Sequence, residues 1–237
     1  MPVIKKYTHL FFDLDNTLWD FESNSIIAME DAFNKFIFPN TKIDFDLFFR
    51  KYSFHNRMLW QAYRSQEIMK KELIIRRFQD TFDELKITGI DPEKMNDYYL
   101  AQMPKQTLLV EGVADILNYL KEKKYKLFII TNGFTEVQHQ KLTKSGIKNY
   151  FDKIFISEEI KSPKPSNEIF EYAIKSSNAK KAKSLMIGDD WDSDICGAVN
   201  YGIDAVFFAK NSKNNIELKT KLNVYQVSKM AELYNIL

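Results

Sequence analysis

An unbroken apolar run that ends in two acids constrains the fold of this chain more than any other feature of its sequence. Leu10, Phe11 and Phe12 precede Asp13 and Asp15. A run without polar alternation is typical of a strand in a parallel sheet, since both faces of such a sheet are covered. The acids then lie at the carboxyl edge of the sheet, where open α/β folds bind their ligands. Residues two apart in an extended chain point the same way, so both carboxylates can face one ligand.

The close spacing of these carboxylates indicates a cation. Neighbouring carboxylates raise each other's pKa unless a positive charge lies between them. Asp13 and Asp15 therefore favour a site with a divalent metal, one nucleophilic or basic carboxylate and a partner that exchanges a proton. The alternative is an ordinary turn after the strand, because Asp15 and Asn16 belong to residue types that favour turns. Taken alone, the pair is compatible with either interpretation.

Polar residues follow a second apolar run in the same way. Thr131, Asn132 and Gly133 come directly after Leu127–Ile130, which predicts another buried strand. A hydroxyl, an amide and a permissive glycine backbone at a strand end can line an anion site. Further along, Lys164 stands between two prolines, which stiffen the backbone around it. A cation on a stiff loop suits a phosphate or a carboxylate nucleophile.

A third apolar run ends in a cluster of acids. Leu185–Ile187 is followed by Gly188 and then by four aspartates within six residues: Asp189, Asp190, Asp192 and Asp194. Mg²⁺ prefers such oxygen ligands. Each segment also has an ordinary explanation, as a turn, a solvated loop or the acidic start of a helix. Four segments that carry acids, a hydroxyl, a lysine and again acids, in this order, are much harder to assign to chance.

Together the four segments resemble the motifs of the haloacid dehalogenase superfamily. Asp13–Thr17 matches the first motif, Thr131 the second, Lys164 the third, and Gly188–Asp189 with Asp194 the fourth. The resemblance covers essentially the whole chain. It implies an α/β fold whose core is a Rossmann-like parallel sheet with the strand order 5-4-1-2-3. It also implies a helical cap of the C1 type, inserted after the first motif.

The resemblance implies a chemistry as well, the hydrolysis of a phosphate monoester. Asp13 is then the nucleophile that becomes an aspartyl phosphate. Asp15 protonates the leaving alcohol and later takes a proton from the attacking water. Thr131 and Lys164 complete the expected catalytic set, because they hold the phosphoryl group and neutralise its charge.

The same resemblance implies Mg²⁺ as the cofactor and assigns further residues to the site. The expected metal ligands are Asp13, Asp15 through its backbone carbonyl, Asp189, and Asp194 through water. Asn132 and Gly133 are expected to contact the phosphate. Asp190 and Asp192 are ambiguous, and we expect them to be exposed or to act behind the ligands.

The branch within the superfamily suggests a substrate. Thr131–Phe134 and the stretch after the first motif resemble the pyrimidine 5′-nucleotidase branch, which implies a nucleoside monophosphate. The residues expected to contact it are Trp19 and Phe21 at the mouth of the site, and Asn56, Arg57 and Trp60 on a cap helix. Aromatic faces beside amide and guanidinium donors can stack on a base and hydrogen-bond to its edge. These aromatic residues can instead form the core of the cap itself.

Other functions fit the motifs less well. A haloacid dehalogenase does not need the second acid, yet Asp15 is present. A sugar phosphomutase of the resembled family usually carries valine where Thr17 stands. A non-enzymatic binding module would be indicated by the loss of a motif residue, and none is lost. A sugar-phosphate phosphatase stays open as an alternative.

A change of periodicity divides the chain into two parts. After Thr17 the strand pattern gives way to helical periodicity until about Lys126. We expect a bundle of about four helices as a cap domain at residues 19–105, and a core domain at residues 1–18 and 106–237. The core should resume with a helix at Val113–Glu122. Its further strands are expected near Leu127, Ile154, Leu185 and Ala205, with a last one at Val224–Val227.

Composition excludes several classes of partner. The formal net charge is only +2, so nothing indicates a nucleic-acid or membrane partner, and no uncharged apolar run is long enough to span a bilayer. The single cysteine, Cys196, excludes an internal disulfide and is typical of a reducing compartment. Together with the resemblance, these features predict a cytoplasmic protein that binds a small-molecule phosphate ester. The sequence does not determine its oligomeric state.

Overall fold

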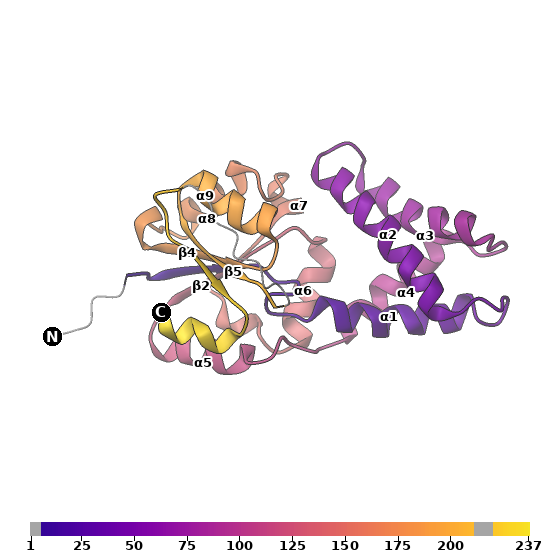
Figure 1. Cartoon of the computed structure of the whole chain (residues 1–237), viewed down its shortest axis with the longest axis horizontal. Helices are drawn as coiled ribbons and strands as arrows, with labels where there is room; N and C mark the ends of the chain where they lie inside the picture. The colour runs from indigo at the N-terminus through magenta and orange to yellow at the C-terminus, as the bar shows by residue number, and fades with distance from the viewer. Residues whose placement is uncertain (1–5, 211–219) are drawn as a thin grey trace. The chain divides into compact units, whose positions relative to one another are not determined.

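The computed structural model describes residues 6–210 and 220–237, and the chain divides into two compact units (Figure 1). The first, called the sheet unit below, combines residues 1–21 with residues 107–237. The second, called the helical unit, comprises residues 22–106. The chain leaves the sheet unit after its first strand and returns to it before its second, so one long insertion separates two neighbouring strands.

The sheet unit is built on one parallel sheet with the strand order β3-β2-β1-β4-β5-β6, which confirms the predicted order and adds β6 at one edge. The strands are β1 (His9–Phe12), β2 (Lys126–Thr131), β3 (Lys153–Ile156), β4 (Ser184–Gly188), β5 (Asp204–Phe208) and β6 (Val224–Val227). In the centre, Phe12 pairs with Ile129 on one side and with Ile187 on the other. Since parallel strands end at the same edge, the residues that follow β1, β2 and β4 meet there.

Helices cover both faces of this sheet. They are α5 (Val113–Glu122), α6 (Thr135–Lys144), α7 (Ser157–Ile160), α8 (Asn167–Ser176) and α9 (Gly197–Tyr201), with a π-helical turn at Trp191–Cys196. Phe11 and Met186 pack with Phe170 of α8 in one buried cluster. Figure 1 shows α5 on the opposite side of the sheet from α8 and α9. The strands are buried on both faces, as their unbroken apolar runs predict.

The helical unit contains four α-helices, namely α1 (Phe21–Phe36), α2 (Phe45–Arg64), α3 (Lys70–Leu85) and α4 (Pro92–Gln102). Aspartates begin two of them. The Asp44 side chain accepts hydrogen bonds from the first backbone amides of α2, and Asp91 does the same for α4, where Pro92 follows. No helix among residues 6–210 and 220–237 combines the length and the apolar character needed to cross a membrane.

Aromatic rings form much of the core of the helical unit. The Tyr52 ring lies 4.9 Å from Phe78 and 5.9 Å from Tyr99, between centroids. A buried cation lies among them, since Arg77 donates from Nε to the Asn96 side chain at 3.0 Å and its guanidinium lies 5.4 Å from the Tyr99 ring. On α2, Leu59 is buried and the neighbouring Met58 is exposed.

Candidate active site

Lys164 lies at the carboxyl edge of the sheet and connects three segments of the chain. Its Nζ atom donates to Asp13 at 2.5 Å, to Asp194 at 2.6 Å and to the backbone carbonyl of Ile130 at 2.8 Å. All three N–H donors of the ammonium group are therefore used, although the residue is only 1% exposed. Burial alone would lower the pKa of Lys164, but the two carboxylates raise it above its ordinary value. Lys164 therefore stays charged.

Asn132, at the end of β2, fixes the backbone of the lysine loop. Its Oδ1 atom accepts from the Lys164 backbone N–H at 2.8 Å, and its Nδ2 atom donates to the Lys164 carbonyl at 3.0 Å. The two bonds pair the backbone N–H and C=O groups of Lys164, as a neighbouring strand would in a sheet. The Asn132 side chain thus holds Lys164, a role that the sequence did not indicate. A role for backbone amides near Asn132 in binding phosphate stays a prediction.

Three carboxylates meet around this lysine. Asp13, Asp189 and Asp194 each present an oxygen within 4.8 Å of the others. Burial raises the pKa of Asp13 and of Asp194, and Lys164 offsets only part of this effect. Burial, together with the neighbouring Asp194 carboxylate, raises the pKa of Asp189 to about 7. The cluster carries more negative charge than Lys164 neutralises, so its residues fit a divalent cation.

Two glycines make room for polar side chains of this site. A Cβ atom on Gly188 would lie 2.2 Å from Oδ2 of Asp194, and one on Gly133 would lie 2.3 Å from the Gln138 side chain. Any larger residue at either position would displace the neighbouring side chain. We predicted Gly133 as a phosphate contact, and the structure gives it the further role of admitting Gln138.

The remaining acids of the third run have separate positions. Asp189 accepts a hydrogen bond from the Thr17 hydroxyl at 3.2 Å. Asp190 is exposed, and its carboxylate accepts from the Ser193 backbone at the start of the π-helical turn. Its backbone N–H donates to Asp194 Oδ2 at 3.1 Å, so both oxygens of Asp194 are bonded within the protein. Asp192 is exposed. Asp190 therefore supports Asp194, whereas Asp192 lies outside the cluster.

Asp15 directs its side chain toward α6. Its Oδ1 atom accepts from Lys141 at 2.6 Å and its Oδ2 atom from Gln138 at 2.9 Å. The same Nε2 atom of Gln138 donates to the hydroxyl of Thr131 at 2.7 Å. The structure thus brings Asp13, Asp15, Thr131 and Lys164 to one edge of the sheet. There Lys164 bonds to Asp13, and Gln138 connects Asp15 with Thr131.

Sequence patterns did not indicate Gln138 or Lys141. Neither follows a strand, and α6 is mostly polar in sequence. Both lie with Val137 and Leu142 on the buried face of the helix. A glutamine and a lysine on the apolar face of an amphipathic helix were the available signal, since buried polar groups need partners.

The two aromatic residues predicted at the mouth of the site, Trp19 and Phe21, differ in burial. Trp19 is fully buried and packs as part of the core, so its ring does not lie at an open mouth of the site. The Lys141 ammonium lies over this ring, 4.3 Å from its centroid. Phe21 is partly buried beside Trp19, at 6.3 Å between ring centroids.

In the helical unit, the predicted contacts share one helix, α2, and have different surroundings. Asn56 accepts from Arg77 at 3.4 Å, and Trp60 packs edge-on against Tyr63. Arg57 is exposed. Their contact with a substrate stays a prediction.

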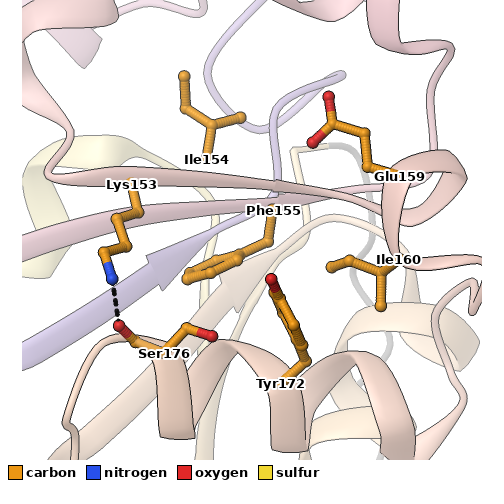
Figure 2. Close-up of a pocket in the computed structure, with 7 residues that line it drawn as sticks. All are labelled: Lys153, Ile154, Phe155, Glu159, Ile160, Tyr172 and Ser176. Carbon is orange, nitrogen blue, oxygen red and sulfur yellow. Dashed lines mark hydrogen bonds between the residues drawn. The ribbon is translucent and has the colours of Figure 1, made fainter.

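A cavity of about 520 Å³ lies elsewhere, along the edge strand β3 (Figure 2). It is lined by Lys153, Ile154, Phe155, Glu159, Ile160, Tyr172 and Ser176. Figure 2 shows the Lys153 ammonium bonded to the Ser176 carbonyl. The Oε1 atom of Glu159 lies 3.3 Å from the Nε2 atom of His139. Its charged side chains are thus paired with protein groups, and none of the predicted catalytic residues lines it. The group of side chains around Lys164 and Asp15, rather than this cavity, is the candidate site.

Comparison with known proteins identifies the family of this chain. A model of the family described as haloacid dehalogenase-like hydrolase matches residues 10–208. The chain is 30% identical to the pyrimidine 5′-nucleotidase YjjG of Escherichia coli over 98% of each chain. It is 32% identical to the pyrimidine 5′-nucleotidase PynA of Streptococcus pneumoniae, over 92% of this chain and 91% of that protein. The crystal structure of the HAD-hydrolase YfnB from Bacillus subtilis bound to magnesium has a TM-score of 0.86 at 27% identity, and covers 98% of this chain and 99% of that one.

Proposed function

The chain belongs to the haloacid dehalogenase-like hydrolase family, and we propose on this basis that it is a Mg²⁺-dependent phosphatase that hydrolyses nucleoside monophosphates. One observation carries the phosphatase proposal. A buried lysine touches a carboxylate that directly follows the central strand of a parallel sheet. A nucleophile held beside a fixed cation, in a site that already gathers acids, suits attack on an anionic phosphate ester.

The proposed reaction has two steps. The Asp13 carboxylate attacks the phosphorus, an aspartyl phosphate forms, and the bond to the leaving oxygen breaks while Asp15 donates a proton to that oxygen. In the second step Asp15 takes a proton from a water molecule, which attacks the phosphorus and regenerates the Asp13 carboxylate. Lys164 neutralises part of the negative charge that gathers around Asp13 in both steps.

The Thr131 hydroxyl suits a phosphate contact for a reason of hydrogen bonding. A hydroxyl has one donor and two acceptor positions. Gln138 donates to this oxygen at 2.7 Å, which uses an acceptor position. The Thr131 proton is then directed to another acceptor, and we propose that this acceptor is a phosphoryl oxygen.

The acidic cluster fits Mg²⁺ by charge and by donor type, since its ligand atoms are carboxylate oxygens within 4.8 Å of one another. Asp13 and Asp189 would bind the ion directly, together with the backbone carbonyl of Asp15. Asp194 would act through water, because both of its oxygens already have protein donors. When bound, Mg²⁺ neutralises negative charge on the phosphoryl group.

The nucleotide preference rests on the relatives, because the two similar bacterial proteins are named pyrimidine 5′-nucleotidases. We propose pyrimidine deoxynucleoside monophosphates as the preferred substrates, with the helical unit as the cap that selects among them. A sugar phosphate is the competing substrate, because it offers hydroxyl groups and no base to stack. The cytoplasmic location stays a prediction.

Substrate profiling tests the proposal. The purified protein with Mg²⁺ is assayed for phosphate release from dUMP, dTMP, AMP, glucose 6-phosphate and β-glucose 1-phosphate, and kcat/KM is compared. We expect a pyrimidine deoxynucleotide to be best. A sugar phosphate that exceeds every nucleotide by about tenfold or more, which is 1.4 kcal/mol in transition-state binding, would refute the nucleotidase assignment and leave the phosphatase chemistry intact. No release from any ester would refute both.

A further inference from the structure

Asp15 is held by α6 at both of its side-chain oxygens. Lys141 donates to Oδ1 at 2.6 Å and Gln138 donates to Oδ2 at 2.9 Å. The two donors stand three residues apart on one helix, so their side chains lie on the same face. A carboxylate with a donor on each oxygen has little freedom to rotate. The direction of the Asp15 side chain is therefore set by α6 and not by its own strand.

The surroundings of Lys141 strengthen this contact. The residue is 3% exposed, and its ammonium nitrogen lies 4.3 Å from the ring centroid of Trp19 and 5.2 Å from that of Phe21. Aromatic faces attract a cation and exclude water from it. A buried charge pair surrounded in this way is screened much less than a pair on the surface. This explains why a fully buried tryptophan follows the first motif so closely, since Trp19 forms one wall of the lysine's pocket.

Gln138 extends the same arrangement to Thr131. Its Nε2 atom donates both to Asp15 and to the Thr131 hydroxyl, at 2.9 Å and 2.7 Å. Its Oε1 atom is buried without a hydrogen-bond partner among the described residues. A buried acceptor without a partner destabilises a protein. In this position the Gln138 amide makes both bonds of its Nε2 atom, while its Oε1 atom is left without a partner among the described residues.

We propose that Lys141 and Gln138 are positioning residues, which fix the Asp15 carboxylate for proton transfer to the leaving group and the Thr131 hydroxyl for contact with the phosphoryl group. This inference rests on the proposed phosphatase function. Neither residue touches the reacting atoms. Both act through the orientation of groups that do, and Gly133 is required because only glycine leaves room for Gln138.

The first test removes the ammonium group and keeps the length of the side chain. Lys141→Met is compared with Lys144→Met, a matched control on the exposed side of the same helix. For a nucleotide, whose leaving alcohol needs a proton, kcat/KM should fall on the order of 10²-fold in Lys141→Met, the usual cost of a misplaced catalytic group. For p-nitrophenyl phosphate the loss should be smaller, because that leaving group departs without a proton. Lys141→Arg should recover part of the nucleotide activity, and Lys144→Met should match wild type.

A double-mutant cycle decides whether Lys141 acts through Asp15. In the Asp15→Asn background, Lys141→Met should cause little further loss for the nucleotide, since the group that it positions is already gone. Multiplicative losses in the double variant, or equal losses for the two substrates in the single variant, would overturn the proposal.

A second variant guards against simple unfolding. Gln138→Met removes the unpaired acceptor as well as the two bonds of Nε2, so the thermal midpoint should change little, yet kcat/KM should fall. A lower midpoint with unchanged activity would show a purely structural role. Failure of the underlying function looks different. In that case wild type releases no phosphate or Asp13→Asn stays active, whereas an active wild type with an unaffected Lys141→Met refutes the positioning role alone.

Discussion

Asp204 and Asp13 lie at opposite edges of the same sheet, and their pKa values shift in opposite directions. Asp204 begins β5 and accepts hydrogen bonds from the Tyr7 hydroxyl at 2.6 Å and from the Asn223 side chain at 2.8 Å. Burial alone would raise its pKa, but these bonds lower it. At the other edge, burial raises the pKa of Asp13, and the attraction of Lys164 only partly offsets this effect.

The opposite pKa shifts of Asp204 and Asp13 show that a buried carboxylate can either stabilise or destabilise the folded protein. At the amino edge one acid is supplied with several donors, so its charge is favourable in the folded protein. At the carboxyl edge three acids share one lysine, so their charges oppose folding unless a further cation is present. Perturbed pKa values of this kind are typical of functional sites. The amino edge therefore contributes to stability, whereas the carboxyl edge gathers acids at a cost in stability, as expected of a functional site.

The same substitution at both edges should have the largest and most different effects. Asp13→Asn should keep the fold and lower kcat on the order of 10⁶-fold, the loss seen when a covalent nucleophile is removed. Asp204→Asn should keep turnover and lower the free energy of unfolding. Phosphate release and chemical denaturation of both variants give the measurement. Activity of Asp13→Asn within about tenfold of wild type would exclude an aspartyl-phosphate route through Asp13.

Metal removal should affect only the carboxyl edge. EDTA should abolish phosphate release and Mg²⁺ should restore it, because the acid cluster is not neutralised by Lys164 alone. In Asp189→Ala the Mg²⁺ concentration for half-maximal activity should rise by at least about tenfold, as expected when a metal site loses a ligand or a residue that supports one. Asp192→Ala is the matched control, since Asp192 is an exposed acid of the same segment. The reverse order would mean that the metal ligand is assigned to the wrong acid.

The pH dependence of stability should carry the sign of the Asp189 shift. Its pKa in the folded protein is raised from 3.8 to about 7, so the folded state binds the proton more tightly than the unfolded state. In metal-free protein, stability should therefore be lost as the pH rises from about 4 to about 7, by at most about 4 kcal/mol. Thermal unfolding in the presence of a chelator measures this loss. Asp189→Asn should reduce it, and an unchanged pH profile in that variant would contradict the assignment.

The smallest expected effect concerns the amino edge. Tyr7→Phe removes a donor from Asp204 and should destabilise the protein by about 2 kcal/mol, the usual worth of a hydrogen bond to a charged group. Because the pKa of Asp204 is lowered, this contribution is present above about pH 4 and is lost as the pH falls through the lower pKa of the folded state. Denaturant titration at neutral and acid pH measures it, with kcat as the control. A change in kcat would mean that the two edges are coupled.

The sequence was most informative where polar residues directly follow an apolar run. The apolar runs before Asp13, Thr131 and Asp189 predicted buried parallel strands, and all three strands form with those residues at or directly after their ends. Hydrophobic periodicity is a local property, so α5 at Val113–Glu122 was predicted to the residue. Identity of residue types in a fixed order was also enough to indicate the family.

The same sequence patterns did not predict burial or hydrogen bonds between residues that are far apart in the chain. Trp19 was predicted at the mouth of the site because it follows the first motif, and it is buried instead. The bonds between the Asn132 side chain and Lys164, 32 residues away in sequence, were not predicted either. Sequence spacing states which residues share a strand end, but not which of them hydrogen-bond to one another.

The α/β class and the acids, the hydroxyl and the lysine at the carboxyl edge could be predicted from the residues themselves. Burial preferences and the geometry of parallel strands act over a few residues, so a sequence pattern records them. The order of the strands was predicted only from the family resemblance. The bonds from Lys141 and Gln138 to Asp15, which lies 126 and 123 residues earlier in the chain, became apparent only in the folded protein. The physical reason is that hydrogen bonds and charge pairs depend on distances of a few ångströms in space, and the packing of α6 against the sheet sets those distances.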